Sequence, residues 1–398
     1  MSHLRLVGFR YSPAIGGAEN YARRLLQQIG TRLDIDVATV LTTNRADWLR
    51  ALIEGERDAP ETYSVDGRSV TAISRWPLST RRRLRLLAPL YHAPMSPVPG
   101  EIGRLLAPHM AELTAGTDIL HNVFMGRESF SLGVMLAAHR ARLPFVFTPL
   151  MHQRLLGWNS PAFHTLYREA DAVIALTEGE AAWLEREGAP RDRLRVIGLG
   201  PQNDPEASPR PAFEALGGEP RIVLFLGQLH AYKGFQVLLK AAHGMESRRD
   251  VLFVFAGPDV RGNSRLFHRA GPNVRWLGAV DNALRDSLLS ACTVLCVPSS
   301  RESFGSVVIE AWASGKPVIG GPAAATRELI EEGVDGWIVP QDPVAIADRI
   351  GRVLNDESMA TEMGCRGKEK VASKFNWEAI ARAHLDVYER ALARPRHA

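Results

Sequence analysis

The residues best suited to chemistry follow a predicted buried strand at 294–297, where a serine-rich loop leads into a helix that begins near Gly305. Glycine at that point lets a ligand approach the backbone closely. The free amides of a helix's first turn, together with the helix dipole, suit an anion such as a diphosphate. The loop carries Glu302 and the helix carries Glu310 about one turn further on. Because two carboxylates repel phosphate, they are better suited to hydroxyl groups that flank it.

A lysine occupies a comparable position earlier in the second half of the chain. Lys233 lies in a loop just after a predicted buried strand at 222–226 and directly precedes Gly234. A lysine in such a loop can bind phosphate as a point charge, and an ordinary solvated lysine is the alternative. Gln228, in the same loop, adds an amide donor.

Further candidates follow strands of the first half. Gly16 and Gly17 come after the first predicted strand and form either a loop that approaches a ligand or only a tight turn. His121 lies at the end of a later predicted strand, where it is either catalytic or a buried, hydrogen-bonded core histidine. His152, after another strand, is a weaker candidate.

The composition is that of an ordinary globular protein. The chain has 398 residues, of which 45% are hydrophobic and 23% charged, and its formal net charge is +4. This length predicts two large domains or three small ones, and the small charge gives no reason to expect a nucleic-acid partner. The start of the chain is too short and too charged for a signal peptide, and no stretch approaches the ~18 apolar residues of a membrane helix. We therefore expect a cytoplasmic enzyme, and the preference for arginine over lysine is typical of a GC-rich bacterium.

Short apolar runs alternate with amphipathic stretches along the chain. Strands are predicted at 4–9, 37–42, 119–123, 145–148, 172–175, 194–197, 222–226, 252–256, 274–277, 294–297 and 318–320. Continuously apolar runs are typical of parallel strands covered by helices on both faces, so the alternation predicts doubly wound α/β domains. A proline-rich segment at 201–220 interrupts the pattern and is interpreted as an interdomain linker. We predict two Rossmann-like domains, 1–205 and 215–375, facing across a cleft where such sheets bind ligands.

Two motifs typical of metal sites have simpler explanations here. Asp34 and Asp36 form a D-x-D pattern, but they lead directly into a predicted strand and are interpreted as a solvated turn. Cys292 and Cys296 lie on or beside a buried strand, where core thiols are commoner than metal ligands. Cys365 stands alone, and three cysteines without paired spacing exclude a disulfide scaffold and a zinc ribbon. The sequence therefore predicts no metal site.

Glu302 and Glu310, with seven residues between them, resemble the E-x7-E motif of the retaining glycosyltransferases of family 4, which have the glycosyltransferase-B (GT-B) fold. The chain is similar to this family at three more places: the loop at 226–234, the strand at 275–278 and the glycine loop at 13–19. Each motif alone is weak, but together they span almost the whole chain.

The resemblance implies a role for each part of the chain. Residues 1–205 would form the acceptor domain, 215–375 the nucleotide-sugar donor domain, and 376–398 a helix that crosses back to the first domain. The donor-binding residues that it implies are Gly16, Gly17, Gln228, Lys233, Glu302, Phe304, Gly305 and Glu310. The catalytic residues that it implies are His121, Lys233 and Glu302.

Within that set the family assigns separate tasks. Glu302 would hold hydroxyls of the donor sugar, assisted by the backbone amides of Phe304 and Gly305. Glu310 would bind the ribose, and Lys233 would bind the diphosphate. The implied reaction moves a sugar from a nucleotide diphosphate sugar to an acceptor hydroxyl, with retention and without a metal or other cofactor. The acceptor stays open among bacterial glycans, glycolipids and small metabolites.

Gln228 departs from the family pattern, which has an arginine at this position. Glutamine keeps a donor but loses the charge, which weakens its bond to phosphate. Arg301 and His230 are the candidates to replace that charge. The alternatives are that the chain binds its donor weakly, or that it is a non-catalytic, glycosyltransferase-like partner subunit. A sugar phosphorylase on the same fold is a third interpretation, which no lysine motif supports.

A basic stretch in the first half is a candidate interaction surface. Arginines interleave with tryptophan and leucine between 75 and 87, at Arg75, Arg81, Arg82, Arg83 and Arg85. Such a helix can associate peripherally with an anionic membrane, here at its inner face. A solvated basic helix face and a site for an anionic acceptor are the alternatives.

Overall fold

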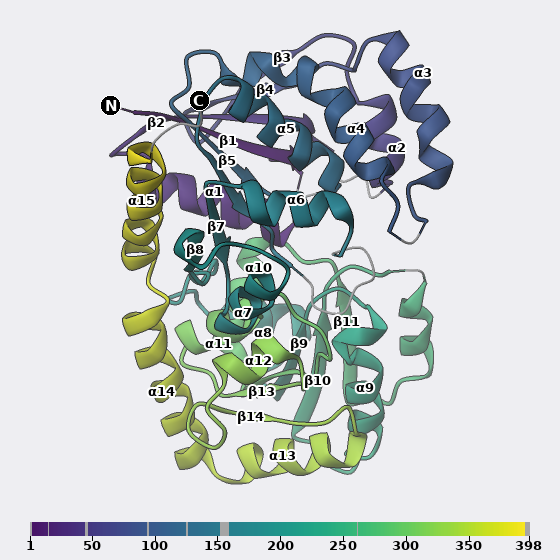
Figure 1. Cartoon of the computed structure of the whole chain (residues 1–398). Coiled ribbons are helices and arrows are strands. Elements are labelled where there is room, and N and C mark those ends of the chain that lie inside the picture. The colour runs from purple at the N-terminus through teal and green to yellow at the C-terminus, as the bar shows by residue number, and fades with distance from the viewer. Residues whose placement is uncertain are drawn as a thin grey trace. The chain divides into compact units, whose positions relative to one another are not determined.

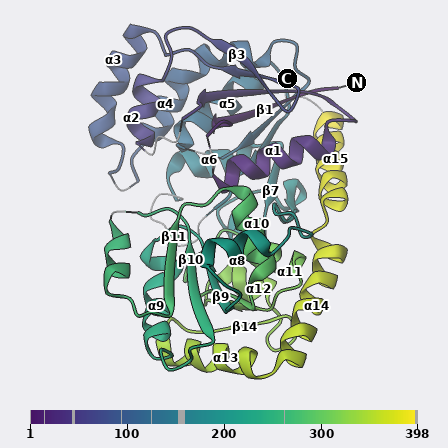
Figure 2. The ribbon, with the colours of Figure 1, turned by 180° about the vertical axis from the view of Figure 1, so that it is seen from behind.

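The structure is a computed structural model that describes residues 2–14, 16–43, 47–93, 95–124, 126–151, 159–260 and 262–394. The chain divides into two compact units (Figures 1 and 2). Unit 1 comprises Met1–Gly198 and Glu378–Ala398, and unit 2 comprises Leu199–Trp377. The last part of the chain therefore packs with the first.

The core of unit 1 is a sheet whose described strands run in the order β3-β4-β2-β1-β5-β6-β7-β8. Its strands are β1 (His3–Arg10), β2 (Asp34–Leu41), β3 (Glu61–Val65), β4 (Arg68–Ala72), β5 (Ile119–Val123), β6 (Phe145–Thr148), β7 (Ala172–Ala175) and β8 (Leu194–Val196). All neighbours pair in parallel except β3 and β4, which form an antiparallel hairpin at one edge.

Helices pack around this sheet. They are α1 (Gly17–Ile29), α2 (Trp48–Glu54), α3 (Leu78–Leu87), α4 (Val98–Leu106), α5 (Glu128–Arg140), α6 (Pro161–Glu169), α7 (Glu178–Arg186) and α15 (Trp377–Ala393), with 3₁₀ turns at Ala88–Leu90, Ala107–Thr114 and Arg191–Arg193. Helix α1 shows why they form, since Tyr21, Leu25 and Ile29 recur at intervals of four and are fully buried. In Figure 2, α15 lies beside α1, and the Tyr21 hydroxyl is 2.8 Å from His384 Nε2 of α15.

Unit 2 contains an all-parallel sheet whose described strands run in the order β11-β10-β9-β12-β13-β14. Its strands are β9 (Arg221–Leu226), β10 (Val251–Ala256), β11 (Val274–Gly278), β12 (Val294–Val297), β13 (Val318–Gly320) and β14 (Gly336–Ile338). Its helices are α8 (Arg210–Leu216), α9 (Phe235–His243), α10 (Asn282–Ala291), α11 (Ser306–Ala313), α12 (Ala324–Leu329), α13 (Pro343–Asn355) and α14 (Glu357–Lys374), with 3₁₀ turns at Ala231–Lys233 and Asn263–Arg269. The predicted α/β class with doubly wound parallel sheets is confirmed.

Two local predictions are wrong. Asp34 and Asp36 do not form a turn: they open β2, because Arg5 of the neighbouring strand donates to Asp36 at 2.8 and 2.6 Å and neutralises it. The proline-rich segment at 201–220 is not a free linker, since it belongs to unit 2 and folds into α8, which packs on α10. Prolines at the first turn of a helix are compatible with the helix, so proline content alone misleads here.

The β3–β4 hairpin was not predicted. Asp66 and Gly67 form its turn, and both have a positive φ, 50° and 76°. An Asp-Gly pair with two positive φ angles is a strong hairpin signal, so this element was within reach of the sequence.

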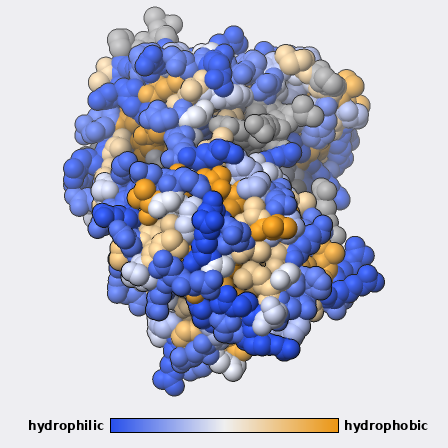
Figure 3. Space-filling model, turned by 90° about the horizontal axis from the view of Figure 1, so that it is seen from below, coloured by the Kyte–Doolittle hydropathy of each residue, from blue (hydrophilic) through white to orange (hydrophobic). Residues whose placement is uncertain are grey.

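The surface is that of an ordinary globular protein. On the face shown in Figure 3, hydrophobic residues occur in small groups among hydrophilic ones. Within the part of the chain that the structure describes, no helix is both long and apolar enough to span a membrane.

Candidate functional site

Two charged side chains that are distant in the sequence meet in unit 2. Lys233 lies in the 3₁₀ turn after β9, and Glu302 lies in the loop after β12. Strands β9 and β12 are parallel neighbours, so the loops at their carboxyl ends lie together. The Lys233 ammonium is 2.7 and 2.8 Å from the two Glu302 carboxylate oxygens. Their side chains are 19% and 9% exposed, so a ligand can still reach the pair.

Tight packing of the two loops fixes this pair. Gly234 has a φ of 78°, and a side-chain carbon there would lie 2.4 Å from the carbonyl oxygen of Pro298. Only glycine fits at that place, so the loop that carries Lys233 sits directly on the loop that carries Glu302. Gln341 strengthens the junction, because its amide donates to the carbonyl oxygens of Pro298 at 2.8 Å and Tyr232 at 3.2 Å.

Helix α11 begins four residues after Glu302. Gly305 precedes its first residue with a φ of 98°, a conformation that favours glycine. Phe304 is buried against Phe375, with ring centroids 5.8 Å apart, which anchors the start of the helix. The amino end of α11 therefore lies on the same loop as Glu302, as an anion site requires.

Glu310 occupies the second turn of α11 and is only 4% exposed. Burial raises the pKa of its carboxyl and Asp286 raises it further, whereas the Arg285 charge and the backbone N–H of Gln202 lower it. A carboxylate in these surroundings accepts hydrogen bonds strongly, because the protein around it has a low dielectric constant.

The two residues considered as replacements for the family's arginine, His230 and Arg301, both lie near Tyr232. Gln228 itself is exposed. The His230 ring stacks on the Tyr232 ring at a centroid distance of 5.1 Å. Burial raises the pKa of the Tyr232 phenol, and the charges of Lys233 and Arg301 partly oppose that rise. Both residues that could replace the missing arginine charge therefore lie around Tyr232, next to Lys233.

In unit 1 the glycine loop leads into α1. Gly17 is exposed, and a side-chain carbon there would meet nothing within 4 Å. At Gly16 it would lie 2.3 Å from a carboxylate oxygen of Glu19, which is buried and paired with Arg10. The backbone of this loop is therefore open at Gly17 and tightly packed at Gly16.

The structure places His121 in the interior of unit 1. It is fully buried, with Nδ1 2.8 Å from the Tyr388 hydroxyl and Nε2 2.8 Å from the Thr148 hydroxyl. Burial lowers the pKa of His121 well below its usual value, and nearby His384 adds to the effect. With both ring nitrogens bonded and no solvent contact, this geometry favours the core role over the catalytic one. His152 lies outside the described residues.

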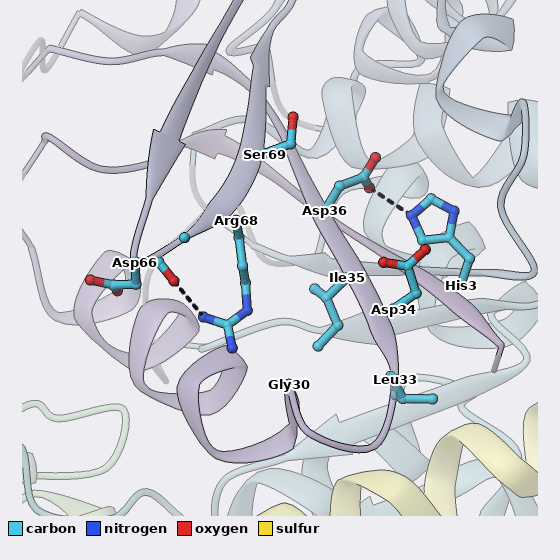
Figure 4. Close-up of a pocket in the computed structure, with 10 residues that line it drawn as sticks. His3, Gly30, Leu33, Asp34, Ile35, Asp36, Asp66, Arg68 and Ser69 are labelled. Atoms are coloured by element: carbon cyan, nitrogen blue, oxygen red, sulfur yellow. Dashed lines mark hydrogen bonds and ion pairs between the residues drawn. The ribbon is translucent and has the colours of Figure 1, made fainter.

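A cavity in unit 1 lies apart from these groups. It encloses about 510 Å³ at the amino ends of β1 and β2, the edge of the sheet opposite to that where such sheets bind ligands (Figure 4). Two of its carboxylates are paired: Asp36 with His3, which also lines the cavity, and Asp66 with Arg23 of α1. Cys292 and Cys296 are buried and unpaired. Among the described residues there is no group of three or more side chains that could hold a metal ion.

Sequence comparison identifies both units. A model of "Glycosyl transferase 4-like domain" matches residues 16–200, and one of "Glycosyl transferases group 1" matches 210–370. A D-inositol 3-phosphate glycosyltransferase of Xylanimonas cellulosilytica is 33% identical over 243 residues, which are 56% of this chain and 58% of that protein. A phosphatidyl-myo-inositol mannosyltransferase of Mycobacterium leprae is 35% identical over 185 residues, 44% of this chain and 48% of that one. The matched regions thus span about half the length of these relatives.

Solved structures agree on the fold. Sucrose-phosphate synthase from Thermosynechococcus elongatus superposes with a TM-score of 0.73 at 21% identity, over 99% of this chain and 100% of that one. Anabaena HepE in complex with UDP and glucose gives 0.71 at 18% identity, over 98% and 100%. The fold is therefore that of the GT-B glycosyltransferases. The two matched domain models define the family more closely: this chain belongs to the group 1 and 4-like glycosyltransferases, and the predicted resemblance to family 4 is confirmed.

The sequence did not reveal the groups that hold Glu310. Gln202 and Asn203 lie more than 100 residues before it, in the segment interpreted as a linker, and Arg285 has no motif of its own. Only the folded chain brings them to α11.

Proposed function

We propose that the chain transfers a sugar from a nucleoside diphosphate sugar to an acceptor hydroxyl, with retention of configuration and without a metal. The observation that carries this proposal is the pairing of Lys233 with Glu302 beside the amino end of α11. Structural relatives solved in complex with UDP, UDP-glucose or ADP support the donor class.

Each group then has a task in the reaction. The bond between the anomeric carbon and the phosphate oxygen breaks, and its electrons stay on the diphosphate. Lys233 and the amides of α11 stabilise that charge in place of a metal. The acceptor oxygen bonds to the same face of the anomeric carbon, and its proton passes to the departing phosphate oxygen. Glu302 holds the sugar hydroxyls, and Glu310 holds the ribose.

The alternative is a non-catalytic partner subunit, for which the sequence argument is Gln228. The position of Arg301 argues against it, because its charge acts on Tyr232, the residue next to Lys233. We therefore favour an active enzyme.

A ligand panel followed by product analysis tests this function. Thermal melting is measured with nucleoside diphosphates and their sugars, on the native chain, Glu310→Ala and the exposed control Glu369→Ala. A ligand at a hundred times its Kd stabilises by about 2.7 kcal/mol. We expect stabilisation by one nucleotide in the native chain and the control, and none in Glu310→Ala. Product from that donor should form in excess EDTA and carry the donor's anomeric configuration by NMR.

A different experimental result would contradict each part of the proposal. Inverted product overturns retention, and activity that EDTA abolishes overturns metal independence. Absence of stabilisation with every donor, together with a requirement for a second protein, supports the partner subunit instead.

We also propose that α3 associates with an anionic membrane. Leu78, Leu86 and Leu90 are 51%, 80% and 59% exposed, and Arg82 lies four residues from both Leu78 and Leu86 on the same face. Arg85 pairs with Glu54 at 2.8 Å, and Arg75 pairs with Asp58 at 3.2 Å.

The basic stretch therefore has two kinds of arginine. Arg81 also lies near Glu54, at 4.0 Å, so Arg75, Arg81 and Arg85 all have a carboxylate partner, with Arg81 and Arg85 sharing one. Within the described part of the chain, Arg82 and Arg83 make no ion pair and are exposed. Exposed leucines with unpaired arginines are the features of an interfacial helix.

Vesicle co-sedimentation tests this surface. The native chain should sediment with phosphatidylglycerol vesicles at low salt, and Arg82→Ala/Arg83→Ala should not. Arg140→Ala/Arg142→Ala, which removes two exposed arginines elsewhere in unit 1, is the control for net charge. If both double variants bind equally, or the native chain stays in solution, the membrane proposal is wrong.

A further inference from the structure

The segment that opens unit 2 is fastened to the helix that carries Glu310. The Gln202 carbonyl accepts a hydrogen bond from Arg285 Nη2 at 3.0 Å, and the Gln202 backbone N–H acts on the Glu310 carboxyl to lower its pKa. The next residue, Asn203, donates its side-chain amide to the carbonyl oxygen of Glu310 itself at 3.2 Å and to Ser314 Oγ at 2.9 Å. Consecutive residues thus hold both the side chain and the backbone of Glu310.

Helix α10 supports this segment from the other side. Arg285 Nε donates to Asp286 Oδ1 at 2.7 Å, and Asp286 Oδ2 accepts the backbone N–H of Asp204 at 2.9 Å. The side chains of Arg285 and Asp286 are 14% and 11% exposed, so little solvent screens their charges. Gln202 and Asp204 are therefore bonded to side chains of α10, and Asn203 is bonded to the α11 backbone and to Ser314 just after it.

The beginning of the segment is also fixed. Trp377 donates its indole N–H to the Pro201 carbonyl at 2.7 Å. Its ring fills the space beside Gly200, where a side-chain carbon would lie 2.6 Å from the ring. A segment held at both ends presents the Gln202 amide to Glu310 as a preorganised donor, which costs no reordering when a ligand binds.

We propose that Arg285 is a positioning residue for the nucleotide: it holds the segment that is fastened to Glu310, and so orients the Glu310 carboxylate for the ligand's ribose. The inference rests on the proposed ribose role of Glu310 and adds a residue outside the family motif. Arg285 touches neither the ligand nor the reacting atoms; it acts through Glu310 alone.

The electrostatics agree with this arrangement. Burial raises the pKa of the Glu310 carboxyl and Asp286 raises it further, whereas the positive charge of Arg285 lowers it. Helix α14 packs along α11, but its Lys370 pairs with Asp335 around Trp312. Strand β13 carries no charged residue. Loss of the Arg285 charge should therefore raise the pKa of Glu310 and weaken ribose binding as the pH falls.

Nucleotide titration against pH tests the proposal, with UDP and ADP as probes. Between pH 8 and pH 6, Arg285→Met should lose more affinity than the native chain, by up to about sixfold if the pKa of Glu310 rises by about one unit. Arg285→Lys keeps the charge and should follow the native profile. Arg248→Met breaks an Arg–Asp pair elsewhere in unit 2 and is the matched control. Dividing the affinity of each variant by that of the native chain at the same pH removes the effect of protonation of the probe's own phosphate.

The outcomes separate the inference from its premise. If Glu310→Gln binds both probes as the native chain does at every pH, the ribose role fails and this inference fails with it. If Glu310→Gln weakens binding but Arg285→Met has the native pH profile, the inference alone is wrong. A loss in Arg285→Met that is equal at all pH values, and that Arg285→Lys does not rescue, means a purely structural role. Melting temperatures measured at each pH show that every variant is folded.

Discussion

Polar side chains gather in both units, and the two groups differ in charge and in access. In unit 2, Lys233 and Glu302 form an ion pair at the ends of two strands, and both side chains remain partly exposed. In unit 1, His121, Tyr388 and His384 are fully buried between β5 and α15. The first group consists of formal charges within reach of a ligand, whereas the second is neutral and closed.

The difference shows which features mark a binding site. In the unit 1 cluster each histidine nitrogen already has a protein partner: His384 Nδ1–H donates to the Ile380 carbonyl at 2.8 Å, which leaves Nε2 to accept from Tyr21. A satisfied neutral network stabilises a core and specifies how its elements pack. Lys233 and Glu302 bond to each other, and the Lys233 ammonium also lies 5.7 Å from the centre of the Tyr232 ring. A phosphate can therefore replace Glu302 as the partner of Lys233, and a sugar hydroxyl can replace Lys233 as the partner of Glu302.

The largest effect expected from this contrast is on the rate of transfer. Lys233→Ala should lower kcat by about 10²–10³-fold, because loss of one preorganised donor to the developing charge costs about 3 kcal/mol. Initial rates with the donor found by the ligand panel measure this. Lys240→Ala, an exposed lysine of α9, is the control and should keep the native rate. A Lys233→Ala enzyme with native kcat would remove Lys233 from the site.

The unit 1 cluster should affect stability instead. Burial lowers the pKa of His384 from 6.5 to about 4, so the unfolded chain binds its proton more readily than the folded one. The stabilisation is therefore fully present above pH 6.5 and is lost as the pH falls towards 4, by about 3 kcal/mol in the free energy of unfolding.

Urea unfolding at several pH values checks this prediction. The native chain should lose stability between pH 6.5 and 4, and His384→Phe should lose less over the same range. His243→Phe, which replaces a histidine whose side chain is 80% exposed, should keep the native slope. Equal slopes in the native chain and His384→Phe would show that the cluster is not the acid-sensitive element.

The surroundings of the unit 2 residues could be predicted better than those of the unit 1 residues, because they depend on nearby parts of the sequence. Two of the site residues, Lys233 and Glu302, follow buried strands. The third, Glu310, lies in the helix that begins soon after Glu302, so short segments of the sequence define all three positions. Strand β5, by contrast, is buried on both faces, and alternation along it does not say what His121 faces. Its partner Tyr388 comes from α15, 267 residues later. The same holds for Arg285, whose link to Glu310 depends on three separate segments meeting.

The smallest predicted effect tests whether a ligand phosphate can take the place of Glu302 beside Lys233. Glu302→Gln removes the carboxylate that competes with phosphate for Lys233, so a nucleoside diphosphate without sugar should bind about fivefold more tightly, or about 1 kcal/mol. The same variant should lose the additional affinity that the sugar provides, because the carboxylate that accepts its hydroxyls is gone. Calorimetry with the diphosphate and its sugar, beside Glu369→Gln as an exposed control, measures both. Weaker binding of the plain diphosphate would mean that Glu302 orients Lys233 for phosphate rather than competing for it, and the contrast between an exchangeable site and a closed core would then lose its basis.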